Sequence, residues 1–150
     1  MEQMEQPGEA CLSLCRGKFL ELLKEGRWEY VRRVNASGAV MIVAVTKEGE
    51  LLLVEEYRVP LHARTVGLPA GISGDEGEES TLQSARRELE EETGYRADSW
   101  TYLFAGPSSP GLTTEMVSFY LAEDLHRISA GGGVAHENIT AVSYTHLRAH

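Results

Sequence analysis

The chain has 150 residues, enough for one globular domain, and its 42% hydrophobic and 25% charged residues fit an ordinary folded protein. A formal net charge of -9 argues against unspecific binding to nucleic acid or to an anionic membrane. No apolar run approaches the roughly 18 to 20 residues of a membrane span, and the polar, acidic N-terminus does not resemble a signal peptide. Cys11 and Cys15 lack a second pair at zinc-finger spacing, so we expect ordinary thiols in a cytoplasmic protein.

The first segments of the chain predict a short hairpin. Residues 1–10 lack periodicity, and we expect them to be disordered. Residues 18–34 fit either a short helix or two strands that turn around Glu25 and Gly26. We favour the hairpin.

Several later runs have the character of strands. Residues 39–46 and 50–57 are nearly all apolar in the middle and are joined by a short turn, so we expect a strand pair covered on both faces. Residues 99–106 and 116–124 also read as strands, and a Gly-rich loop precedes a last apolar run that starts at Ile139. Strands on both sides of a buried helix predict an α/β sandwich with a mixed sheet.

The best-defined predicted element is a helix from Ser80 to Thr93. It stops at Gly94, a residue suited to the left-handed C-cap position. The helix dipole disfavours negative charge near a C-terminus. Four carboxylates nevertheless crowd into the last turns, namely those of Glu88, Glu90, Glu91 and Glu92.

A helical wheel separates these acidic side chains. Glu88, Glu91 and Glu92 border the apolar stripe of the helix, with Glu92 closest to the core, whereas Glu90 points elsewhere together with Arg86. Carboxylates beside an apolar surface must be protonated, paired or neutralised, and hard oxygen ligands suit Mg²⁺ or Mn²⁺. A solvated acidic helix with i,i+4 ion pairs would show the same charge pattern, so the spacing leaves both interpretations open.

The segment RELEEETGY, residues 87–95, resembles the second half of the Nudix box. In that motif a Gly, five residues, a Glu and seven residues precede Arg-Glu, an aliphatic residue, any residue, Glu-Glu, any residue, Gly and an apolar or aromatic residue. Glu79 stands eight positions before Arg87, as the motif requires. Gly71 precedes Glu79 by eight positions where the motif has six, so the loop between them holds a two-residue insertion.

The resemblance covers about residues 16–142 and implies a metal-dependent hydrolase that cleaves a nucleoside diphosphate linked to another group. It implies a backbone ligand at Ala70 and carboxylate ligands for Mg²⁺, or alternatively Mn²⁺, at Glu88, Glu91 and Glu92. Glu88 and Glu91 would also be catalytic. The structural members of the motif would be Gly71, Glu79, Arg87 and Gly94, with Arg87 orienting the carboxylates.

Segments outside the box resemble the ADP-ribose pyrophosphatase branch of the family, namely residues 54–61 and 108–115. By this resemblance we expect Arg58 to hold diphosphate oxygens, as a guanidinium can do with two hydrogen bonds. A surface Arg at a strand end is the structural alternative. The substrate would also contact a loop containing Pro110, Gly111 and Leu112.

Further residues take roles by the same resemblance. Phe19 and Trp28 correspond to rings that stack on adenine, in some relatives from the second subunit of a dimer, although such rings more often pack. Glu137 lies in the late loop that brings a Glu over the metals, and it would activate water. An exposed loop acid is the alternative there.

The resemblance divides the chain into a disordered N-terminus at 1–10, a Nudix hydrolase domain at 11–142 and a non-native tail at 143–150. The expected fold is a Nudix α/β/α sandwich with an N-terminal hairpin extension, its C-terminal helix missing. The expected activity is hydrolysis of ADP-ribose or another nucleoside diphosphate sugar by a homodimer that binds neither nucleic acid nor membrane. Two alternatives are a pyrophosphohydrolase of nucleoside triphosphates or dinucleotide polyphosphates, and a ligand-sensing module without turnover.

Overall fold

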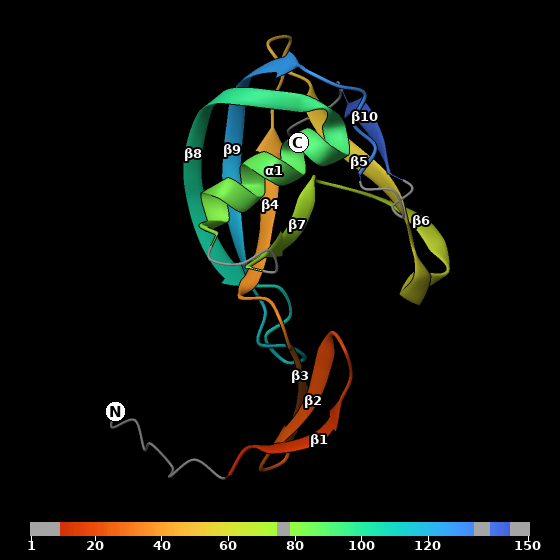
Figure 1. Ribbon diagram of the computed structural model, residues 1–150, viewed down its shortest axis with the longest axis vertical. Coiled ribbons are helices and arrows are strands. Elements are labelled where there is room, and N and C mark those ends of the chain that lie inside the picture. Colours follow the sequence, from red (N-terminus) through yellow and green to blue (C-terminus); the bar gives the residue numbers. More distant parts are fainter. Residues whose placement is uncertain (1–9, 75–78, 134–138, 145–150) are drawn as a thin grey trace, which may run out of the picture.

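The computed structural model describes residues 10–74, 79–133 and 139–144, and these residues form three sheets and one α-helix (Figure 1). The N-terminal sheet consists of β1 (Leu12–Arg16), β2 (Leu20–Glu25) and β3 (Trp28–Arg33). The central sheet has the order β7-β4-β9-β8, formed by Ala70–Ser73, Gly38–Ala44, Met116–Arg127 and Tyr95–Pro107. The third sheet has the order β10-β5-β6, formed by Thr140–Tyr144, Leu51–Arg58 and Ala63–Gly67.

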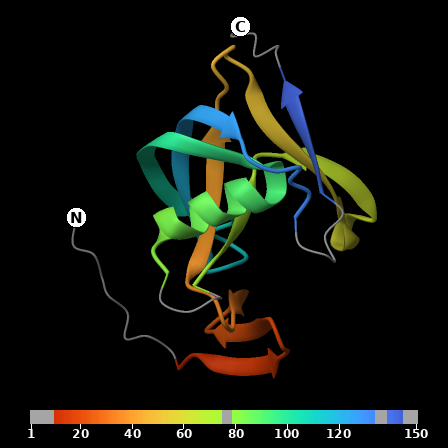
Figure 2. The same ribbon diagram turned by 45° about the horizontal axis from the view of Figure 1, so that its top comes forward.

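The central sheet is mixed, as the sequence predicts. β4 runs parallel to β9, whereas the β4–β7 and β8–β9 pairs are antiparallel. The helix α1 (Thr81–Thr93) crosses one face of this sheet, and its C-terminal end reaches β5 and β10 (Figures 1 and 2). The core lies between helix and sheet, where Val40, Ile42 and Leu89 are completely buried.

The predicted helix is confirmed, and both of its ends have identifiable causes. Ser80 is the N-cap, with its hydroxyl accepting from the Gln83 N–H, while the Gln83 side chain accepts from the Ser80 N–H. Gly94 ends the helix in the left-handed region at φ 74°. Among the described residues α1 is the only α-helix, and a single 3₁₀ turn, η1 (Val59–Leu61), joins β5 to β6.

The expected pairing of the two strands after residue 38 is wrong. One isolated bridge, between Val45 and Leu51, joins β4 to β5 next to the connecting turn. The strands then diverge, because β4 pairs with β7 and β9 while β5 pairs with β6 and β10. Each strand alternates buried with half-buried residues instead of burying both faces, and β5 becomes exposed at its end.

The N-terminal hairpin is confirmed, with β1 as an additional strand on its outer side. This sheet stands away from the rest of the molecule (Figures 1 and 2). Its link to the central sheet is the segment 108–115, where Leu112 O accepts from the Val31 N–H at 2.8 Å and Thr114 N–H donates to Val31 O at 3.2 Å. An ion pair between Arg33 and Glu115 reinforces this link.

Candidate functional site

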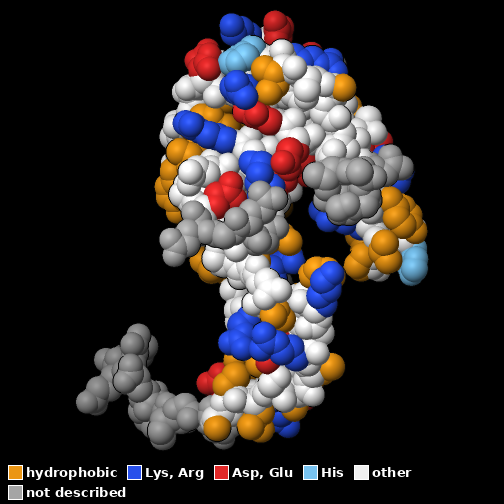
Figure 3. Space-filling view, in the orientation of Figure 1, with side chains coloured by type: hydrophobic (Ala, Val, Ile, Leu, Met, Phe, Trp, Pro, Cys, Tyr) orange, Lys and Arg blue, Asp and Glu red, His pale blue; other side chains and the backbone are white. Residues whose placement is uncertain are grey.

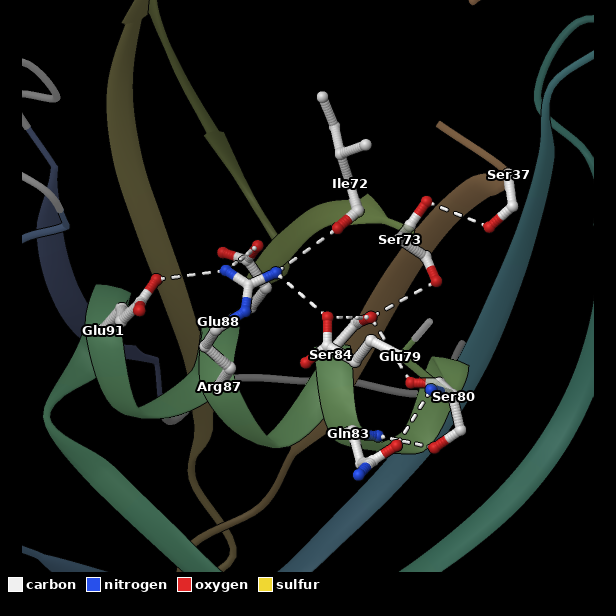
Figure 4. A network of polar contacts seen from close by, with 10 residues as sticks. All are labelled: Ser37, Ile72, Ser73, Glu79, Ser80, Gln83, Ser84, Arg87, Glu88 and Glu91. Atoms are coloured by element: carbon white, nitrogen blue, oxygen red, sulfur yellow. Dashed lines mark hydrogen bonds and ion pairs between the residues drawn. The ribbon is translucent and has the colours of Figure 1, made fainter. Parts of the chain in front are cut away.

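The candidate site lies where α1 passes over β7, and Arg87 is at its centre (Figure 4). The Nη1 atom of Arg87 lies 2.9 Å from a carboxylate oxygen of Glu88 and 3.3 Å from one of Glu91. Its Nη2 atom lies 3.5 Å from a carboxylate oxygen of Glu79 and 3.5 Å from the carbonyl oxygen of Ile72. One guanidinium thus joins three acidic residues of the motif to β7.

These acidic neighbours stabilise the positive charge of Arg87. Burial disfavours the cation, but attraction to Glu88 and Glu79 prevails and raises the pKa of the guanidinium. Carboxylates this close to one another would otherwise repel. The predicted role of Arg87 in orienting the carboxylates therefore has a geometric basis, and its contact with Glu91 is an i,i+4 ion pair.

The glycine at the start of the motif makes room for Glu88. A Cβ built on Gly71 would lie 1.9 Å from the Cδ atom of Glu88 and 2.0 Å from its Oε1 atom. No side chain fits there unless the Glu88 carboxylate moves. Although Gly71 is two positions farther from Glu79 than the motif expects, it lies directly against Glu88 of the motif helix.

Glu92 is buried, with 5% of its surface exposed. Its Oε2 atom accepts from the Ala70 N–H at 3.1 Å, and Ala70 is held in β7 opposite Met41 of β4. The structure thus brings together two predicted ligand residues from separate segments. Glu90 lies apart, because Arg96 donates two hydrogen bonds to it and lowers the pKa of its carboxyl group. Arg86, which the helical wheel places on the same side as Glu90, lies over the Trp100 ring.

The donor chemistry of the site fits a hard divalent cation, because its carboxylate side chains supply oxygen ligands. These side chains are those of Glu79, Glu88, Glu91 and Glu92. The side-chain positions are those of an ion-pair cluster: Glu79, Glu88 and Glu91 face Arg87. In the described part of the chain, no three His, Cys, Asp or Glu side chains are arranged to hold a metal ion.

The predicted substrate residues lie outside this cluster. Arg58 ends β5, is more than half exposed and forms an ion pair with Glu56. Pro110, Gly111 and Leu112 are exposed in the segment that binds β3. Phe19 and Trp28 are exposed on the N-terminal sheet, at 66% and 57%. Glu137 and the inserted loop residues 75–78 lie outside the described residues.

Two buried serines of the site were not predicted. Ser73 of β7 and Ser84 of α1 are 1% and 0% exposed, and their hydroxyl oxygens are 3.2 Å apart. The Ser84 hydroxyl also donates to Glu79. The signal was present in the spacing, because Ser84 precedes Glu88 by four positions and Glu91 by seven, so it shares their helix face.

Comparison with known proteins gives consistent matches. The NUDIX domain family matches residues 36–148. The ADP-ribose pyrophosphatase of Bacillus subtilis is 38% identical over 131 residues, which are 83% of this chain and 70% of the relative. The ADP-ribose pyrophosphatase of Mycobacterium tuberculosis is 40% identical over 95 residues, 63% of this chain and 45% of the relative. The GDP-mannose pyrophosphatase of Escherichia coli K12 is 32% identical over 127 residues, 79% of this chain and 63% of the relative.

A solved structure supports the same fold. The chain superposes on an ADP compounds hydrolase with a TM-score of 0.76, over 95% of this chain and 80% of the other, at 24% identity. That similarity concerns the fold. Of the three relatives above, the chain spans less than two thirds of two and 70% of the third. In the described residues, no helix combines the length and apolar character needed to cross a membrane.

Proposed function

Because the chain belongs to the Nudix family, we propose that it hydrolyses the diphosphate of ADP-ribose, or of a related nucleoside diphosphate sugar, to a nucleoside monophosphate and a sugar phosphate. The observation that carries the proposal is the carboxylate cluster around Arg87 on the motif helix. The substrate class is supported by relatives named for ADP-ribose and GDP-mannose.

The residues of the candidate site, together with Glu137, have distinct parts in this proposal. Glu88 and Glu92 are the main ligands of Mg²⁺, or alternatively Mn²⁺, with the Ala70 carbonyl as a backbone ligand and Glu91 as a further ligand or base. Such a cation neutralises phosphate oxygens and activates water. Arg87 keeps the carboxylates near β7, and Gly71 leaves space for Glu88. Glu137 accepts the proton of the attacking water.

Substrate binding extends the proposal to the surrounding elements. Arg58 would hold the diphosphate, the segment Pro110 to Leu112 would line the site, and Phe19 and Trp28 would stack on the base. The exposure of these rings supports a homodimer in which one subunit's N-terminal sheet covers another's site.

Apolar side chains also gather at the outer end of the β5–β6 hairpin, including Val59 and Leu61 (Figure 3). The proposal also places the protein in the cytoplasm.

The test is turnover of ADP-ribose, GDP-mannose, UDP-glucose and dATP, with and without Mg²⁺, by the original chain and by Glu92→Gln. We expect ADP-ribose to be hydrolysed only with Mg²⁺. Glu92→Gln should lower kcat at least about 100-fold, because even changes behind metal ligands cost 10- to 100-fold.

Glu90→Gln is the matched control, because Glu90 belongs to the same helix but pairs with Arg96. We expect it to keep kcat within about twofold. Full activity of Glu92→Gln would refute the metal-site assignment. Preferred turnover of dATP would point to a triphosphate pyrophosphohydrolase, and binding of ADP-ribose without turnover would point to a sensing module.

A further inference from the structure

Two buried hydroxyl groups connect β7 with the first turn of α1. Ser73 and Ser84 are almost completely shielded from solvent, and their Oγ atoms lie 3.2 Å apart. Burying a hydroxyl without a hydrogen-bond partner is costly, so both protons must be used within the protein. The direction in which the Ser84 proton points follows from its three acceptors.

The Ser84 oxygen has three possible acceptors but only one proton. It lies 2.9 Å from Glu79 Oε2, 3.3 Å from the Ser80 carbonyl oxygen and 3.2 Å from Ser73 Oγ. The carboxylate is the nearest acceptor and forms the stronger, charge-assisted bond. The Ser84 proton is therefore directed mainly to Glu79, and the Ser73 hydroxyl oxygen and the Ser80 carbonyl oxygen are the more distant acceptors of the same hydroxyl.

The same oxygen of Glu79 leads to the candidate site. Glu79 Oε2 lies 3.5 Å from Arg87 Nη2, on the side of the guanidinium opposite its contacts with Glu88 and Glu91 (Figure 4). A continuous series of polar contacts thus runs from Ser73 through Ser84, Glu79 and Arg87 to two proposed site carboxylates. Ser37 is attached differently, because its hydroxyl donates to the Ser73 backbone carbonyl at 3.0 Å.

We propose that Ser84, supported by Ser73, is a positioning residue of the candidate site. The Ser84 hydroxyl, which lies between Ser73 and Glu79, fixes the Glu79 carboxylate, which fixes the Arg87 guanidinium and thereby the starting positions of Glu88 and Glu91. The consequence for catalysis rests on the proposed function. The geometric part does not, because it concerns contacts within the protein alone.

The kinetic test compares the original chain with Ser84→Ala, Ser73→Ala, Glu79→Gln and the double variant Ser84→Ala/Glu79→Gln. Ser84→Ala should lower kcat about tenfold with little change in KM, because a supporting group behind site residues is lost. In the Glu79→Gln background, Ser84→Ala should have little further effect. Ser84 reaches Arg87 only through the Glu79 carboxylate, which this variant has already lost. Ser73→Ala should show a smaller loss.

Ser37→Ala is the control, since it removes a neighbouring hydroxyl that does not contact Ser84 or Glu79. It should keep kcat within about twofold. A Ser84→Ala variant with unchanged kcat, or losses for Ser84 and Glu79 that simply multiply, would overturn the proposed positioning role.

A second measurement separates this inference from the proposed function. Urea unfolding of the metal-free single and double variants gives the coupling between Ser84 and Glu79 without reference to any substrate. If no substrate is hydrolysed, the proposed function fails, yet non-additive unfolding free energies would still support the connection. Additive free energies would overturn it in either case.

Discussion

Each of the four glutamates near the end of α1 has a partner that offsets its unfavourable position in the helix dipole. Arg87 contacts Glu88 and Glu91, Arg96 contacts Glu90, and the Ala70 N–H contacts Glu92. The Arg87–Glu91 contact is an i,i+4 pair within the helix, whereas Arg96 and Ala70 belong to neighbouring strands. The acidic helix end is thus stabilised by residues of β7 and β8 as well as by its own arginine.

Replacing Gly71 by Ala should disable the site with little effect on the rest of the fold. The added methyl group would overlap the Glu88 carboxylate, so that side chain must leave its position beside Arg87. We expect kcat for the preferred substrate to fall at least about tenfold. Steady-state kinetics and a thermal melt measure the two effects separately.

Gly67→Ala is the control for this substitution, because a Cβ there has no neighbour within 4 Å. It should leave kcat nearly unchanged. Equal activity of the Gly71→Ala and Gly67→Ala variants would show that the position of Glu88 beside Gly71 does not matter.

The helix wheel predicted which acidic residues share a face, because helical periodicity fixes directions around the axis. Glu88, Glu91 and Glu92 do lie on the β7 side, and Glu90 lies apart. The wheel could not predict that Arg96 forms an ion pair with Glu90. Arg96 belongs to the next strand, and its position depends on the reversal of the chain at Gly94. The spacing also places Ser84 on the face of Glu88 and Glu91, but the spacing alone does not indicate which acceptors a serine hydroxyl reaches.

At the level of elements, α1 depends on a sharp reversal at Gly94. Its φ of 74° lies in the left-handed region, and a Cβ there would lie 2.3 Å from the Ser129 carbonyl oxygen. The segment after β9 therefore packs directly against the end of the helix. Hydrogen bonds from Gly132 N to Glu92 O and from Gly133 N to Glu91 O continue this contact.

Gly94→Ala should lower the free energy of unfolding by roughly 2–4 kcal/mol, because left-handed strain and overpacking add. Gly49→Ala is a matched control: its φ is 78°, but a Cβ there meets nothing within 4 Å. That substitution should cost only about 1–2 kcal/mol. Urea unfolding measures both, and equal losses would mean that the contact with Ser129 adds nothing.

The wrong expectation about β4 and β5 has a clear physical origin. The turn between them is a local signal, and it does join two strands, as the bridge at Val45 and Leu51 shows. The sheet to which each strand belongs is decided by partners farther along the chain. β6 follows β5 closely, but the other partner, β10, follows it by many residues, and local patterning does not specify that pairing.

Across the whole molecule, the N-terminal sheet is joined to the segment that holds Pro110, so two parts of the proposed substrate site are in direct contact. The contacts are the backbone hydrogen bonds of Val31 and the Arg33–Glu115 ion pair. Glu115 directly precedes β9, which lies in the middle of the central sheet. The ion pair of Arg33 with Glu115 thus connects the N-terminal sheet to β9 of the central sheet.

Arg33→Gln should loosen this connection without unfolding the protein. We expect faster hydrogen exchange at the amides of Val31 and Thr114, which form the joining hydrogen bonds. Arg32→Gln is the control, because Arg32 pairs with Glu21 inside the N-terminal sheet. Similar exchange at Val31 and Thr114 in the original chain and in Arg33→Gln would show that the backbone contacts suffice.

The parallel pairing of β4 with β9 also has a consequence for synthesis on the ribosome. β4 is made early, but β5, β6, β7, α1 and β8 all precede its parallel neighbour. Until β9 leaves the exit tunnel, β4 lacks one of its two neighbouring strands, although it carries the buried residues Val40, Ile42 and Ala44. The motif helix must therefore wait for later residues before its core closes, so any delay in translating β9 delays the site and the fold together.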